Sequence, residues 1–93
     1  MHVAVCSITI FMPAVGSLKG KRQIVKSLIG RIRSRTHASV AETGFQDIWH
    51  QAEIGVAIVS SDKGMLDKQI NLIRVIVDDC GDAETVEFLV EYI

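Results

Sequence analysis

Apolar residues recur along this chain with two different periods, and the places where the period changes predict six elements. Short runs rich in Val, Ile and Thr, or alternating apolar and polar residues, are typical of strands. Apolar residues at i, i+3, i+4 and i+7 are typical of amphipathic helices. The strands are predicted at Val3–Phe11, Ser39–Phe45, Ala52–Ser60 and Val86–Tyr92, and the helices run from Leu18 to near Thr36 and from a cap at Ser61 or Asp62 to Gly81.

The order of these elements, β-α-β-β-α-β, predicts an α+β ferredoxin-like fold. In that fold four antiparallel strands form one sheet with the order 4-1-3-2, and both helices cover the same face. The chain has 93 residues, which is enough for one small hydrophobic core. We therefore expect a single domain over residues 1–93.

Three of the predicted connections share one end of the sheet, because neighbouring strands run in opposite directions. This end holds the start of the first helix, the turn at 46–50 and the loop at 78–82. A helix N-terminus has unpaired N–H groups that attract anions, and lysine and arginine surround this one. A nucleic-acid or anion site is expected at Ser17, Lys19, Lys21, Arg22, Lys26 and Arg33, and partner contacts at Gln46, Asp47, Trp49 and His50.

A helical projection separates Lys21 from the other basic residues of the first helix. Four of them form a stripe beside the apolar face, and the stripe is either a solvated surface or a contact surface for phosphates. Lys21 falls inside the apolar arc. It is either ion-paired with Asp47 or an acid of the 78–82 loop, or it binds an anion. The stripe consists of Lys19, Arg22, Lys26 and Arg33.

Trp49 is the only tryptophan and lies in the predicted turn. Such a residue either folds back over the core or stays exposed and anchors a partner. His50 is expected to make hydrogen bonds within the turn, where Asp47 is in reach. No serine has the setting of a catalytic nucleophile, so the sequence favours a protein that is not an enzyme.

Charge is divided unevenly between the two halves of the chain. Residues 1–46 hold seven Lys or Arg and one acid, a net charge of +6. Residues 47–93 hold three bases and ten acids, a net charge of −7, so the whole chain carries −1. With 48% hydrophobic residues, the composition excludes disordered, collagen-like and coiled-coil classes.

Cysteine, histidine and hydropathy patterns exclude several other classes. Cys6 and Cys80 both lie in apolar segments and are expected to be buried, unpaired thiols in a reducing cytoplasm. The three histidines lie on separate segments without metal-ligand spacing, so no metal or other cofactor is expected. The first apolar run is far shorter than a membrane span, and no membrane association is expected.

The sheet face opposite the helices is predicted to be open. Its positions include Glu53, Glu87 and Glu91, and acids there oppose the stacking of RNA bases on the sheet. Apolar residues on both faces of the first and third strands instead predict partial cover by a second subunit. We expect a homodimer through this open face.

Four segments of the chain together resemble the YlxP-like family of small bacterial proteins, whose domain has no known function. The resemblance implies a ferredoxin-like fold and a setting near translation accessory genes, and so favours RNA or ribosome binding. Gly20 stands where the family favours an acid, and His50 where glutamine is usual. The segments are Ser17-Leu18-Lys19-x-Lys21-Arg22, Ser39-Val40-Ala41-Glu42, Gln46-Asp47-x-Trp49 and Ala52-x-x-Gly55-x-Ala57-x-Val59-Ser60.

Two functional hypotheses follow from the sequence. The first is a non-enzymatic module that binds RNA or a ribonucleoprotein through the basic helix. The second is a homodimeric interaction or structural module that binds no nucleic acid. A sensor of small anions at the start of the first helix is a third and weaker hypothesis.

Overall fold

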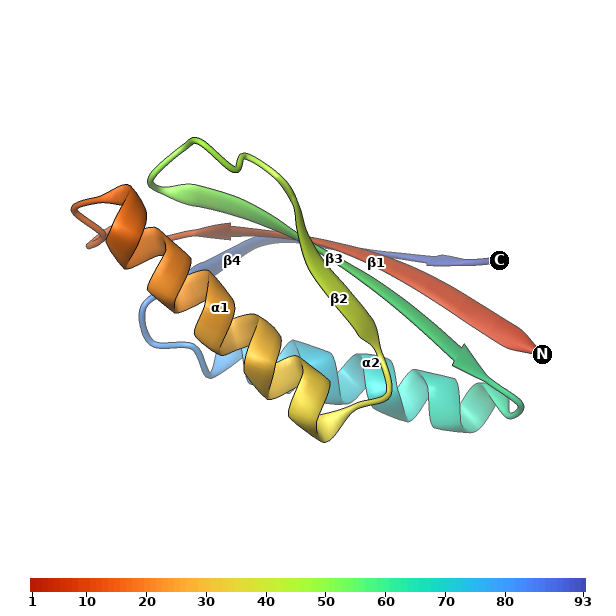
Figure 1. Cartoon of the computed structure of the whole chain (residues 1–93). Coiled ribbons are helices and arrows are strands. Elements are labelled where there is room, and N and C mark those ends of the chain that lie inside the picture. Colours follow the sequence, from red (N-terminus) through yellow and green to blue (C-terminus); the bar gives the residue numbers. More distant parts are fainter.

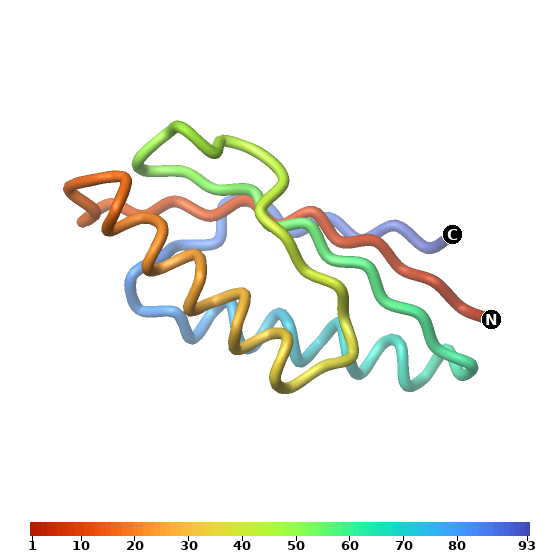
Figure 2. The backbone as a smooth tube through the Cα atoms, in the orientation of Figure 1, coloured from red at the N-terminus to blue at the C-terminus, as the bar shows by residue number.

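A computed structural model describes all residues from Met1 to Ile93 and contains six elements, in the predicted order. Figures 1 and 2 show the long strands on one side and the two helices on the other, with both chain termini at the same end. The strands are β1 (His2–Phe11), β2 (Ser39–Gly44), β3 (Gln51–Ser60) and β4 (Glu84–Tyr92), and the helices are α1 (Leu18–Arg35) and α2 (Lys63–Asp78).

The four strands form one antiparallel sheet with the order β2-β3-β1-β4. This is the predicted 4-1-3-2 order read from the other edge, and both helices pack on one face (Figure 1). The ferredoxin-like fold is therefore confirmed. The central pair, β1 and β3, stays in register over ten residues from His2 opposite Ser60 to Phe11 opposite Gln51.

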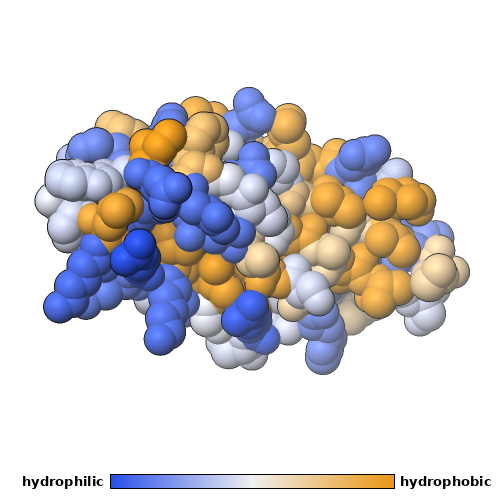
Figure 3. Space-filling view, turned by 45° about the horizontal axis from the view of Figure 1, so that its top comes forward, coloured by the Kyte–Doolittle hydropathy of each residue, from blue (hydrophilic) through white to orange (hydrophobic).

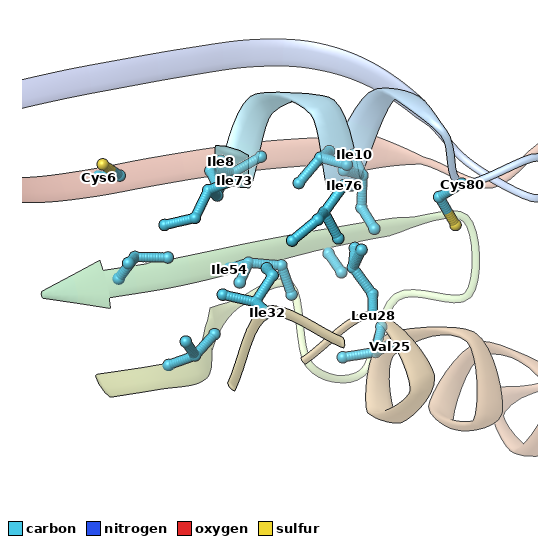
Figure 4. Close-up of a cluster of buried hydrophobic side chains, with 14 of the residues drawn as sticks. Cys6, Ile8, Ile10, Val25, Leu28, Ile32, Ile54, Ile73, Ile76 and Cys80 are labelled. Atoms are coloured by element: carbon cyan, nitrogen blue, oxygen red, sulfur yellow. The ribbon is translucent and has the colours of Figure 1, made fainter. Parts of the chain in front are cut away.

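The core lies between the sheet and the helices. Every second residue of β1 and β3 points inward and is buried, and the apolar stripes of α1 and α2 close over them (Figure 4). Cys6 and Cys80 are both buried free thiols, as predicted, and they lie at opposite ends of this cluster (Figure 4). Burial raises the pKa of the Cys6 thiol, and Arg74 offsets part of that rise.

Each helix begins at a side chain that accepts a hydrogen bond from an otherwise unpaired backbone N–H. Ser17 Oγ accepts from the N–H of Gly20 at 3.0 Å, which confirms the predicted cap of α1. Asp62, one of the two residues predicted for α2, accepts from the N–H of Met65 at 3.2 Å. Neither helix is long and apolar enough to cross a membrane.

No part of the chain covers the sheet face opposite the helices. Large apolar side chains lie exposed on it, Val59 at 58% and Leu89 at 55%. Figure 3 shows apolar side chains spread over the end that carries the termini, while hydrophilic ones gather at the opposite end. The open sheet face therefore presents apolar side chains that the fold itself leaves uncovered.

Candidate nucleic-acid interface

Lys21 is the centre of the predicted site, and its side chain is only 1% exposed. It lies in the first turn of α1, on the same side as the core residues Val25, Leu28 and Ile32. The Nζ atom donates to the backbone carbonyl oxygens of Phe45, Ile48 (2.6 Å) and Gln46 (3.3 Å). The helix thus uses its one inward-facing lysine to hold the loop between β2 and β3.

The acid that pairs with Lys21 is Glu42, whose Oε2 lies 3.2 Å from Nζ. Oε2 is buried and makes no aligned hydrogen bond, so the contact is electrostatic. The predicted pairing with Asp47 or with an acid of the 78–82 loop is wrong. Side chains alternate across a strand, so Glu42 shares the inward face of β2 with buried Val40, and this parity was the signal that could have identified it.

These contacts leave Lys21 little capacity to bind an anion. An ammonium has three N–H donors, and four acceptors already surround this one. An outside anion would have to displace the loop to reach Nζ. The geometry therefore favours the structural alternative for Lys21, with Glu42 as the partner.

The loop at residues 45–50 turns its carbonyl groups toward Lys21 and its large side chains toward solvent. Phe45 has a positive φ of 57°, a conformation uncommon outside glycine, and this ends β2 one residue earlier than predicted. The exposed fractions are 41% for Phe45, 46% for Ile48 and 47% for Trp49. Trp49 is thus not a lid over the core. Phe45 and Ile48 are exposed beside it and were not among the predicted contact residues.

Of the other predicted residues of this loop, His50 and Gln46 make hydrogen bonds and Asp47 is exposed. His50 Nδ1 lies 3.1 Å from the carbonyl oxygen of Met12, and the N–H of Met12 donates to the carbonyl of His50 at 2.7 Å. Gln46 donates from Nε2 to the carbonyl of Glu42 at 3.2 Å. Asp47 is exposed, and His50 pairs with Met12 rather than with Asp47.

The four residues of the basic stripe are all exposed, and Arg22, Lys26 and Arg33 lie on the side of α1 that faces β2. A groove of about 560 Å³ separates this side of α1 from β2, and Arg22, Lys26 and Arg33 line it together with Glu42. Arg33 Nη2 donates to the carbonyl of Val40 at 2.6 Å, which ties the end of α1 to β2. Lys19, Arg22 and Lys26 therefore have no protein partner, whereas Arg33 also stabilises the fold through its hydrogen bond to β2.

The predicted meeting of the start of α1 with the 78–82 loop also takes place, on the other side of the helix. A hollow of about 630 Å³ lies between them and is lined by Gly16, Gly20, Arg31, Cys80 and Asp82 among others. Ser17 lies beside it as the cap of α1. No group of three or more His, Cys, Asp or Glu side chains is placed to hold a metal ion.

Comparisons with known proteins identify relatives without a described activity. Residues 3–90 match the family model described as "Protein of unknown function (DUF503)". The chain is 32% identical over 69 residues to the uncharacterized protein YlxP of Bacillus subtilis (strain 168), covering 74% of this chain and 75% of that protein. This match agrees with the resemblance noted in the sequence.

Two solved structures of designed proteins share the fold. The de novo designed protein Foldit4 has a TM-score of 0.59 and 15% identity, covering 100% of this chain and 97% of that one. The de novo designed protein LFR1 1, with a ferredoxin fold, has a TM-score of 0.57 and 14% identity, covering 100% and 84%. At these identities the likeness concerns the backbone arrangement alone.

Proposed function

The chain belongs to the DUF503 family of proteins of unknown function, and from that premise we propose a non-enzymatic module that binds RNA or a ribonucleoprotein through α1. The observation that carries the proposal is that three cations of the basic stripe, Lys19, Arg22 and Lys26, are exposed and have no protein partner. These cations lie together on one side of one helix, beside a groove. Phosphate groups at the spacing of a nucleic-acid backbone are the natural ligands of such a row.

The charges of α1 support this proposal beyond the stripe itself. The first turn of α1 contains no acid, and the last turn contains Arg33 and Arg35. Glu42 is the one acid that lines the groove, and its charge is paired with Lys21. A phosphate on this side of α1 therefore meets cations with little opposing charge.

The salt dependence of RNA binding tests the proposal. Each phosphate contact on a single strand contributes a slope of about −0.7 to log K against log salt. In the double variant Arg22→Ala, Lys26→Ala we expect a slope less steep by about 1.4 and weaker binding at low salt. The control is Lys63→Ala, Lys68→Ala, which removes the same charge from exposed positions on α2. Absence of wild-type binding to ribosomal RNA at low salt would overturn the proposal.

A second candidate, a homodimer through the open sheet face, rests on a different observation. Leu89 and Val59 are more than half exposed there, and Val5, Ala41 and Ala57 line a shallow apolar depression on the same face. This face lies opposite α1, so a dimer formed through it leaves both basic stripes accessible.

The proposal also places the protein in the cytoplasm. RNA is present there, and the compartment keeps thiols such as those of Cys6 and Cys80 reduced. No cofactor or metal has a role in it.

A further inference from the structure

The loop at residues 45–50 exposes three large apolar side chains to solvent. Phe45, Ile48 and Trp49 are each between 41% and 47% exposed, within a stretch of five residues. Two of the five aromatic residues of the chain are in this loop. Clustered exposed apolar side chains mark contact sites more often than isolated ones do.

The loop is held in place from beneath, so these side chains are presented in a fixed arrangement. Lys21 binds three of its carbonyl groups, and His50 and Met12 join its far end to β1 through their backbone groups at 2.7 Å. A surface that is already ordered loses less entropy when a ligand binds. The loop therefore has the rigidity of a binding surface.

The chemistry around the loop indicates the kind of ligand. Lys21 of α1 reaches under the loop, and the exposed cations Lys19 and Arg22 lie within two residues of Lys21 on the same helix. Aromatic rings next to exposed cations are the pair of features that binds single-stranded nucleic acid, because bases stack on the rings while cations contact the phosphates.

We propose that Trp49 and Phe45 form a stacking platform for unpaired bases, so that the RNA bound through α1 is single-stranded or looped. This inference rests on the function proposed above and specifies its ligand. Bases inside an RNA duplex are already stacked on one another and cannot reach the rings. Asp47, exposed on the same loop, is suited to accept a hydrogen bond from an N–H group of a base, including the ring N–H of uracil.

The test compares two RNA probes and uses Trp49 as its own reporter. Trp49 is the only tryptophan, so its fluorescence reports directly on this loop. The probes are an oligouridine of about 12 nucleotides, within the range that small single-strand-binding domains cover, and an RNA duplex of the same length. We expect the oligouridine to quench Trp49 fluorescence and the duplex to bind without quenching.

Substitutions then separate stacking from phosphate contact. Trp49→Ala should weaken oligouridine binding about tenfold, the usual effect of losing one stacked base. Trp49→Phe should restore most of it, and neither change should alter duplex binding. Thermal unfolding of each variant shows whether the fold is intact.

The outcomes distinguish failure of this inference from failure of the proposed function. If Trp49→Ala binds oligouridine like the wild type while Arg22→Ala, Lys26→Ala does not, the stacking platform is wrong and the phosphate surface stands. An equal loss of oligouridine and duplex binding in Trp49→Ala would show a merely structural role. Dependence on Trp49 for binding intact ribosomes but not oligouridine would assign the loop to a protein contact. If the wild type binds neither probe, the proposed function itself is wrong.

Discussion

A lysine is placed inside a protein only where acceptors replace the water that its ammonium loses. Lys21 meets this condition with three backbone carbonyl groups of the 45–50 loop and the carboxylate of Glu42. The long side chain thereby connects the first turn of α1 to a loop more than twenty residues away in the sequence. Lys21 therefore fixes the position of the loop.

Replacing Lys21 by methionine keeps an unbranched side chain only one atom shorter and removes the charge. Breaking a buried ion pair costs about 3–5 kcal/mol, and because Glu42 is partly exposed we expect a loss near the lower end, about 3 kcal/mol, in the free energy of unfolding. Urea denaturation measures it. Lys19→Met, an exposed lysine two residues away, should change stability by less than about 0.5 kcal/mol.

The two cysteines give a second prediction at this scale. Cys6 has no exposed surface, and burial raises the pKa of its thiol, so little of the reactive thiolate forms at neutral pH. Cys80 is also buried. Cys80 lines the hollow beside the start of α1 and is the more accessible of the two. A thiol reagent should label Cys6 slowly in the folded protein and label two thiols per chain after denaturation. Rapid labelling of Cys6 in the folded protein would contradict the burial of the first core strand.

At the scale of elements, the fold could be predicted because each segment has one clear period. The apolar positions of α1 recur every three to four residues and those of β3 every two, and both sets are buried. The boundaries moved by at most three residues. β2 ends at Gly44 because Phe45 adopts a positive φ, β4 begins at Glu84 rather than at Val86, and α2 ends at Asp78 rather than at Gly81.

The candidate site could be predicted only in part. The topology alone brings the start of α1 to the 45–50 loop, and this meeting was expected. The identity of the acid beside Lys21 and the exposure of Phe45 and Ile48 were not. Glu42 could have been identified from its alternation with buried Val40 on β2. The exposure of Phe45 and Ile48 depends on the path of a six-residue loop, which is set by contacts between segments rather than by any local period.

Replacing each of two glycines, one in α1 and one in β3, by alanine should change the stability of the protein in opposite directions. Gly30 lies on the exposed side of α1 with no atom within 4 Å of an added Cβ, so Gly30→Ala should stabilise by about 0.5–1 kcal/mol through helix propensity. At Gly55 of β3 an added Cβ would lie 2.6 Å from Cγ2 of Thr43 on β2, and Gly55→Ala should destabilise by about 1–3 kcal/mol. Thermal unfolding of both variants checks the pair.

Tyr92 connects the end of β4 to α2 through a hydrogen bond to Asp67, and this bond makes the stability of the fold depend on pH. Its hydroxyl donates to Asp67 at 2.8 Å, and Lys63 donates to the same carboxylate at 3.1 Å. The hydrogen bond from Tyr92, followed by that from Lys63, lowers the pKa of the Asp67 carboxyl below its ordinary value. A carboxyl with a lowered folded pKa stabilises the protein above its unfolded pKa and loses that contribution as pH falls through the folded value.

Tyr92→Phe should therefore lower the denaturation midpoint at neutral pH, and the difference from the wild type should shrink below pH about 4. Urea titrations across that range measure it. A difference that stays constant down to the lowest pH would show that the hydroxyl acts through packing rather than through Asp67.

For the whole molecule, near-neutral net charge conceals two surfaces of different chemistry. The exposed cations of α1 lie on the helical side, and the sheet leaves Leu89 and Val59 uncovered on the other. Glu87 and Glu91 share the outward face of β4 with Leu89, since the three alternate with inward-facing Phe88 and Val90. An RNA surface on one side and a self-association surface on the other are therefore compatible in one chain.

The dimer is tested by light scattering at micromolar concentration, where we expect twice the chain mass of 10.2 kDa. Leu89→Lys places a charge on the open face, on the edge strand β4, and should give a monomer. Val75→Lys adds the same charge at a half-exposed apolar residue of α2, and should leave the dimer intact. If the wild type is a monomer, the proposed dimer is wrong. If Leu89→Lys is still a dimer, the interface lies elsewhere on the surface.

Because α1 lies on the opposite side of the sheet (Figure 1), Leu89→Lys should leave the salt slope of RNA binding per chain unchanged.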